Sequence, residues 1–226
     1  MELLILIPSL FVLLYCLYKL FKDDYVFMRK NVSAEQAFDV AFAVIWVSLL
    51  SSRLVYLLLH PQGQNLFLSF FSAKIGGLSF VGGVIGGIIM LYLISKYKKL
   101  PLGRLSDFFT ISFLVSLPLA FLSNAFLHRK IALLFDIFNA AIYFLLVLFF
   151  TKVLYPKLMQ RTLKEGNITI IFMLFFSLIS FGSSFLIADK KVMPWMEPQN
   201  FLYLGLFILA IILLIKQGMG KGRKGS

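Results

Sequence analysis

The amino-acid sequence predicts an all-α integral membrane protein, with seven transmembrane helices in one bundle and residues 1–226 as a single domain. The first observation behind this is composition: 60% of the residues are hydrophobic, 14% are charged, and the mean hydropathy is +0.92. A soluble domain needs more polar surface than this composition supplies. The second observation is that the apolar residues fall into runs of about 20, the length that crosses the hydrocarbon core as a helix.

The seven runs are separated by polar segments. The predicted spans are residues 2–20, 36–59, 77–95, 106–127, 131–154, 168–188 and 197–216. The apolar segment 65–71 is too short to cross the membrane, and we expect it at the interface. The first run begins with Met1 and the acidic Glu2 and lacks an Ala-x-Ala cleavage site, so we expect a retained span rather than a signal peptide.

Basic residues concentrate in alternate loops, which predicts the orientation of the chain. Of the 22 Lys and Arg residues, 16 lie on one predicted side and 6 on the other. The richer side holds Lys19, Lys22, Arg29, Lys30, Lys96, Lys98, Lys99, Arg104, Lys152, Lys157, Arg161, Lys164, Lys216, Lys221, Arg223 and Lys224. This places the N-terminus outside and the C-terminus in the cytoplasm. The basic tail has no interleaved aromatic residues, which favours contact with anionic lipid over a nucleic-acid partner.

A glycine-rich stretch, residues 76–87, begins the third predicted span. Gly82 and Gly86, like Gly83 and Gly87, are four residues apart, which gives a helix one smooth strip where another backbone can approach. Packing of helix against helix is the usual role of such a strip. The two further glycines at 76 and 77 also allow the backbone to bend and approach a ligand, so both interpretations stay open here.

Several polar side chains lie inside the predicted spans, toward the outer leaflet. They are Arg53, Ser79, Asn124, Asp136, Ser183 and Ser184, with Tyr56 one helical turn beyond Arg53. A charge within a span costs about 2.5–3.5 kcal/mol on insertion scales and usually has a partner. Arg53 and Asp136 are the natural pair. They form either a structural ion pair or part of a polar pocket in which Arg53 holds an anionic lipid headgroup through its planar fork.

Other chemistry-bearing residues are few. Asp107 follows Pro101 and is expected in the first turn of its helix, where a carboxylate stabilises the helix dipole. His128 occupies a short outer turn and is a candidate proton carrier, although a single loop histidine is usually only solvated. The single cysteine, Cys16, excludes an intramolecular disulfide and suggests no metal cluster, so we expect neither a metal nor another cofactor.

Four segments carry a resemblance to a known family. Residues 76–87 are close to its glycine-rich signature around the third span, and residues 51–56 look like its small-small-Arg-Leu-x-Tyr segment. Residues 98–107 look like its cytoplasmic turn into the fourth span, and Phe135 with Asp136 falls where the family has Tyr-Glu. The chain therefore resembles the prolipoprotein diacylglyceryl transferases, over nearly its whole length in span number and orientation.

The resemblance implies a function. The family consists of seven-span enzymes of the bacterial inner membrane that transfer diacylglycerol from phosphatidylglycerol to the lipobox cysteine of a preprolipoprotein, at the outer face. The implied partners are therefore a phosphatidylglycerol-like phospholipid and a preprolipoprotein signal peptide. The resemblance and the residue types make His128 and Asp136 candidate catalytic groups. The candidate lipid-binding residues are Arg53, Tyr56, Ser79, Gly82, Gly83 and Asn124.

Other positions depart from the family. Val81 stands where the family has a histidine, and Phe121 where it has an arginine. In the sixth span Ser184 and Ala188 replace an arginine and a glutamate. Two hypotheses follow: a divergent transferase, or a non-catalytic lipid-binding or scaffolding protein derived from the family. A small transporter is disfavoured because the sequence has no inverted repeat.

Overall fold

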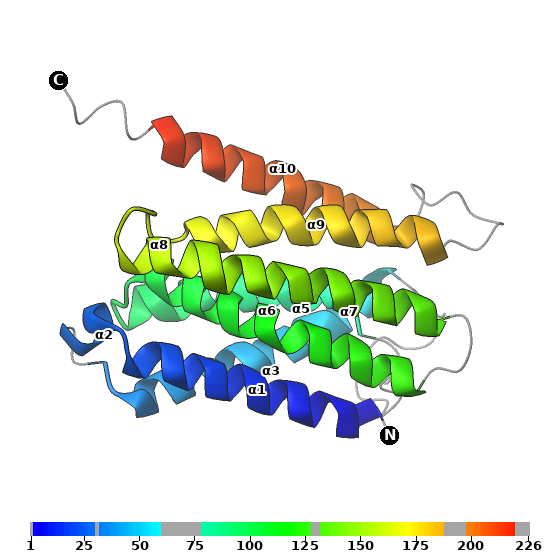
Figure 1. Cartoon of the computed structure of the whole chain (residues 1–226), viewed down its shortest axis with the longest axis horizontal. Helices are drawn as coiled ribbons and strands as arrows, with labels where there is room; N and C mark the ends of the chain where they lie inside the picture. Colours follow the sequence, from blue (N-terminus) through cyan, green and yellow to red (C-terminus); the bar gives the residue numbers. More distant parts are fainter. Residues whose placement is uncertain (1, 30–31, 60–77, 128–131, 188–197, 220–226) are drawn as a thin grey trace. The chain divides into compact units, whose positions relative to one another are not determined.

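The computed structural model describes residues 2–29, 32–59, 78–127, 132–187 and 198–219, and all regular structure within them is helical (Figure 1). Residues 76 and 77, segment 65–71 and His128 lie outside the described residues. The elements are α1 (Glu2–Lys22), α2 (Tyr25–Arg29), α3 (Ala34–Leu59), α5 (Phe80–Tyr97), α6 (Leu102–Leu127), α7 (Ala132–Phe149), η1 (Phe150–Leu154), α8 (Tyr155–Met159), α9 (Asn167–Ile187) and α10 (Pro198–Met219).

Within the described residues, six helical segments are long and apolar enough to cross a membrane. They are Glu35–Leu59, Phe80–Tyr97, Leu102–Phe126, Leu133–Met159, Asn167–Ser184 and Gln199–Gln217. These segments confirm a multi-pass helical membrane protein and correspond to the second to seventh predicted spans. The first predicted span, 2–20, coincides with the apolar helix α1, which is not among the six. Seven crossings and the orientation of the termini stay predictions.

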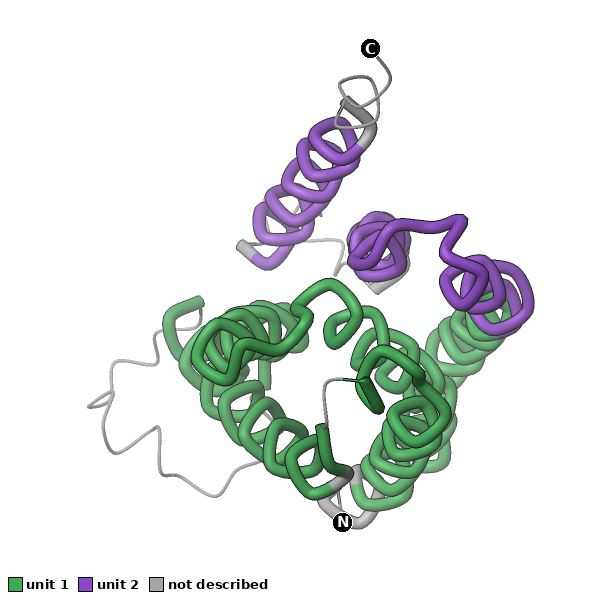
Figure 2. Tube along the Cα trace, turned by 90° about the vertical axis from the view of Figure 1, so that its left-hand side faces the viewer, with its two compact units in different colours: residues 1–147 green, residues 148–226 purple. Residues whose placement is uncertain are grey.

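The chain forms two compact units, unit 1 (Met1–Val147) and unit 2 (Leu148–Ser226), coloured separately in Figure 2. In unit 1, α3 packs along α5 and α1 packs along α6. In unit 2, α9 packs along α10. The sequence predicts that the helices of both units form a single bundle, and this stays a prediction.

A buried ion pair fastens the α1–α2 turn of unit 1 to α6. Nε and Nη2 of Arg104 lie 2.8 and 2.7 Å from Oδ2 of Asp24. The other carboxylate oxygen accepts the backbone N–H groups of Val26 and Phe27, which begin α2. Arg104 also lies 5.5 Å from the ring centroid of Phe108, within cation–π range. Asp24 is 0% exposed, so both carboxylate oxygens exchange water for protein donors.

The prediction that Asp107 lies in the first turn of its helix is wrong. The carbonyl of Pro101 accepts the N–H of Leu105 at 2.9 Å, so α6 begins at Leu102 rather than at residue 106. Asp107 therefore lies more than one turn inside α6, and it is fully buried. Proline suits the start of a helix because its fixed φ fits and its missing N–H would have no helical partner there.

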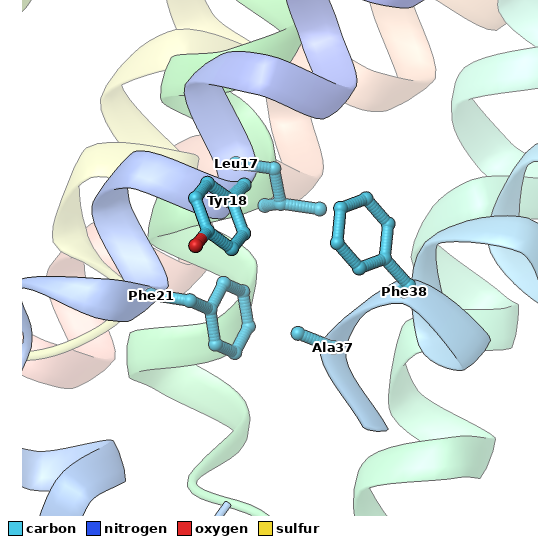
Figure 3. A pocket seen from close by; sticks show the side chains of 5 residues that line it. All are labelled: Leu17, Tyr18, Phe21, Ala37 and Phe38. Atoms are coloured by element: carbon cyan, nitrogen blue, oxygen red, sulfur yellow. The ribbon is translucent and has the colours of Figure 1, made fainter. Parts of the chain in front are cut away.

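A small apolar pocket lies between α1 and α3 (Figure 3). Its lining residues are Leu17, Tyr18, Phe21, Ala37 and Phe38. The rings of Tyr18 and Phe38 stack with centroids 5.9 Å apart across it. The lining of this pocket supplies no charge that could hold a lipid headgroup.

Candidate lipid-binding site

The site is built from two junctions in unit 1, and the first joins α3 to the start of α5. The backbone N–H of Ser79 donates to the carbonyl of Ser52 at 3.0 Å, and the Ser52 hydroxyl donates to the carbonyl of Ser79 at 2.7 Å. Ser79 has extended backbone, and its hydroxyl accepts the N–H of Gly82 at 3.3 Å as the N-cap of α5. Ser79 is 1% exposed, so its hydroxyl serves the helix start.

The glycine strip of α5 faces α3. A Cβ atom on Gly82 would lie 2.7 Å from Cβ of Val55, and one on Gly87 would lie 2.8 Å from Oγ of Ser48. A Cβ on Gly86 would collide with Ser51, whose hydroxyl also donates to the carbonyl of Gly82 at 2.9 Å. Helix packing is therefore confirmed as the role of this strip.

Gly83 is the exception on the strip. A Cβ there would lie 3.5 Å from its nearest neighbour, the carbonyl oxygen of Ser48, which is ordinary contact. Arg53 and Tyr56 follow Ser52 on α3, and both are half-buried. Lipid binding by these residues and by Gly82 stays a prediction.

The second junction is the seam between α6 and α7, where two of the predicted residues meet. Nδ2 of Asn124 donates to Oδ2 of Asp136 at 2.9 Å. Asp136 is 2% exposed, and Asn124 is half-buried. A charged acceptor shortens and strengthens such a bond relative to a neutral pair. The predicted pairing of Asp136 with Arg53 stays a prediction.

Two further residues of α7 belong to this seam, and the sequence analysis missed them. Asn139 is 2% exposed and donates to the carbonyl of Phe135 at 3.0 Å. Tyr143 is 1% exposed and stacks on Phe121, with ring centroids 5.3 Å apart and planes within 7°. Their spacing from Asp136, three and seven residues, places all three on one helix face and is the signal that could have found them.

The comparisons with known proteins decide the family. The family model for prolipoprotein diacylglyceryl transferase matches residues 3–129, more than half of the chain. The chain belongs to this family. The matched region lies within unit 1 and contains the α3–α5 junction and Asn124, whereas Asp136 and the rest of α7 follow it.

Individual relatives agree. A phosphatidylglycerol–prolipoprotein diacylglyceryl transferase of Clostridium novyi (strain NT) is 25% identical over 222 residues, covering 84% of this chain and 82% of the relative. Proteins of the same name from Clostridium kluyveri and Tropheryma whipplei (strain TW08/27) are 26% and 37% identical over 98 and 92 residues. These two alignments cover 43% and 40% of this chain and 38% and 34% of the relatives. No solved structure matches.

Three of the positions that depart from the transferase family lie within the described residues, and Ala188 lies outside them. Val81, where the resemblance places a histidine, is 0% exposed in α5. Phe121, where it places an arginine, forms the aromatic stack with Tyr143. Ser184 on α9 donates to the carbonyl of Phe181 at 2.7 Å, and Ser183 to that of Ser180 at 3.0 Å, so both hydroxyls bond within their own helix. Among the described residues, no cluster of His, Cys, Asp or Glu could hold a metal ion.

Proposed function

We propose that this chain binds a phosphatidylglycerol-like lipid in unit 1 and transfers its diacylglycerol to the cysteine of a prolipoprotein. The observation that carries the proposal is the position of the family match, residues 3–129, within the unit that holds both the α3–α5 junction and the Asn124–Asp136 pair. The relatives' printed names supply the substrates.

The proposed reaction forms a bond between the cysteine sulfur and a glycerol carbon, breaks the bond from that carbon to the phosphate oxygen, and releases glycerol phosphate. It requires a group that takes the thiol proton and positive charge near the departing phosphate. Arg53 is the proposed phosphate ligand, because a guanidinium presents two parallel donors to phosphate oxygens. Asp136, oriented by Asn124, is the proposed proton acceptor, and His128 is the alternative.

The proposed setting is the bacterial inner membrane, with seven spans and the N-terminus outside. This orientation places Arg53, Ser79, Asn124 and Asp136 toward the outer leaflet, where a translocated signal peptide would present its cysteine. Tyr56, Gly82 and Gly83 complete the proposed lipid site through the α3–α5 junction.

A non-catalytic lipid-binding protein is the second candidate. Two observations favour it: the buried Val81 offers no proton carrier, and Phe121 offers no charge for a phosphate. Both positions are filled by side chains that stabilise the fold through burial. Under this second proposal, the protein still binds lipid at the site in unit 1 but does not catalyse the transfer.

The deciding experiment uses the purified chain in nanodiscs with acyl-labelled phosphatidylglycerol and a lipobox peptide. We expect a thioether-linked diacylglyceryl peptide, and we expect Arg53→Ala to abolish it. Arg29→Ala is the matched control, because Arg29 is an exposed arginine at the end of α2. Lipid binding without product would establish the non-catalytic candidate. Failure to bind the labelled lipid would refute both.

A further inference from the structure

One end of unit 2 is strongly cationic. Among its described residues, Lys152 of η1, Lys157 of α8, Arg161 and Lys164 of the turn before α9, and Lys216 of α10 are all exposed. The single carboxylate among those residues is Glu165. Figure 1 shows α8, the start of α9 and the last turns of α10 at the same end of unit 2. We call these five basic residues the cationic end of unit 2.

The turn that carries Arg161 is held by hydrogen bonds. The carbonyl of Lys157 accepts the backbone N–H of Thr162 at 3.0 Å, that of Leu163 at 3.2 Å and the Thr162 hydroxyl at 2.9 Å. Arg161 has φ of 58°, a left-handed conformation that a non-glycine residue adopts only when its surroundings hold it there. The backbone of the turn is therefore held in place, and the Arg161 side chain that it carries is exposed.

A second contact joins this turn to α10. Nζ of Lys164 donates to the carbonyl of Gln217 at 2.7 Å. A cation at the C-terminus of a helix also stabilises its dipole. The contact places the end of α10, where Lys216 precedes Gln217, beside the turn that carries Arg161 and Lys164.

The two units differ in whether their basic side chains form salt bridges with carboxylates. In unit 1, Arg104 pairs with Asp24 at 2.7 Å and Lys98 with Asp39 at 3.9 Å. No carboxylate pairs with a cation among the described residues of unit 2. Stability of the fold does not require five like charges at one end of a unit, because like charges repel one another, so an anion from outside the chain is the natural complement.

The surroundings of Lys216 identify the kind of anion. Ile208 and Ile212 lie eight and four residues before Lys216 on the same face of α10, and they are 48% and 57% exposed. An exposed apolar stripe that ends in a cation matches the shape of a phospholipid, with acyl chains along the stripe and phosphate at the cation. A nucleic acid or an acidic peptide has no acyl chain that would lie along the apolar stripe.

We propose that the cationic end of unit 2 binds the headgroups of anionic phospholipids, at a site separate from the substrate site in unit 1. Clusters of four to eight basic residues beside a transmembrane helix attract anionic lipid at close range. Each cation strengthens this attraction about fivefold, from roughly 1 kcal/mol per basic residue, and salt weakens it.

The test uses the full chain in detergent and counts bound phosphatidylserine against phosphatidylcholine by native mass spectrometry. Phosphatidylserine is anionic, and its headgroup differs from that of the proposed substrate. The variant K157Q/R161Q/K216Q should lose roughly 100-fold in phosphatidylserine affinity at low salt, from about fivefold per cation. The matched control K96Q/K98Q/K99Q removes three exposed cations from unit 1 and should keep the affinity within about twofold.

Equal losses in the two triple variants would overturn the proposal, because the effect would then follow total charge. Binding of phosphatidylserine no tighter than phosphatidylcholine would also overturn it and leave these cations as topology signals. Displacement of the lipid by an acidic peptide at equal charge would assign the surface to a protein partner.

Discussion

At the scale of single residues, breaking the buried Asp24–Arg104 ion pair should cause a large loss of folding stability. Both groups are buried, and the carboxylate accepts four short contacts from two backbone and two guanidinium N–H groups. A buried pair gives little net stability relative to apolar replacements, but removing one partner leaves an uncompensated charge. The pair therefore specifies how the α1–α2 turn docks on α6.

Asp24→Asn should destabilise the protein by about 3–5 kcal/mol, because the guanidinium of Arg104 stays buried beside a neutral amide. The matched control is Asp39→Asn, which removes an exposed partner of Lys98 and should cost well under 1 kcal/mol. Unfolding in mixed micelles, followed by circular dichroism, measures both. Equal small effects would mean that solvent reaches the Asp24–Arg104 pair.

The glycine strip gives a second test at this scale. Gly86→Ala should destabilise by about 1–3 kcal/mol, because the new methyl group overlaps Ser51 of α3. Gly83→Ala should be neutral or stabilising by up to about 1 kcal/mol, because its Cβ meets ordinary contact and alanine favours a helix. The same unfolding measurement applies.

Two controls sharpen the comparison. Gly205→Ala on α10 places a methyl group where nothing lies within 4 Å, so it reports helix propensity alone. Ser51→Gly in the Gly86→Ala background removes the overlapping atoms, so the double variant should lose less stability than the sum of the two single variants. A loss at Gly83 as large as that at Gly86 would contradict the assignment of the strip to α3 packing.

At the scale of elements, the seam between α6 and α7 distinguishes the two proposed functions. Phe121→Arg places a cation on the half-buried position where the family has one. If transfer is limited by charge at the departing phosphate, the variant should raise the transfer rate at least tenfold, since single electrostatic donors contribute about 10²–10³ in related cases. The nanodisc transfer assay measures it.

Val81→His, which also restores a family residue, should behave differently. Val81 is 0% exposed, so a larger polar ring has no room and should destabilise by about 1–3 kcal/mol before any gain in chemistry. A stable, more active Val81→His protein would contradict this packing. No gain from Phe121→Arg, in a protein that still binds lipid, would favour the non-catalytic candidate.

The elements themselves were predictable to different degrees. Apolar runs located the spans because membrane helices need about 20 such residues. The start of α6 was misplaced, because Pro101 begins the helix and no apolar periodicity marks that position. The Asp24–Arg104 contact joins residues 80 apart, so no local pattern could reveal it. Asn124 and Asp136 were expected at one depth, but their contact depends on which helices are neighbours.

At the scale of the whole molecule, the proposed roles divide between the two units. Unit 1 contains the region matched by the family, both junctions and the candidate site residues Arg53, Asn124 and Asp136. Unit 2 contributes apolar helices with a cationic end. The division predicts that substitutions at the cationic end change lipid affinity without removing transfer, whereas Arg53→Ala removes transfer by weakening substrate binding in unit 1.

The number of crossings can be tested through the two ends of the chain. Seven spans place the termini on opposite sides of the membrane, whereas six place them on the same side. In a Cys16→Ser background, Ser226→Cys should react with an impermeant maleimide only after the cells are permeabilised, because the basic tail is expected in the cytoplasm. Lys191→Cys, between the last two predicted spans, should react in intact cells and serves as the positive control.

An N-terminal epitope tag completes the test, since α1 is the helix on which the count depends. In the predicted orientation, α3 begins on the cytoplasmic side of the membrane. A tag that is accessible in intact cells lies on the outer side, so α1 must then cross the membrane between the tag and α3. A tag protected together with residue 226 would mean an even number of crossings. In that case Glu2–Lys22 would lie along the membrane or within the protein.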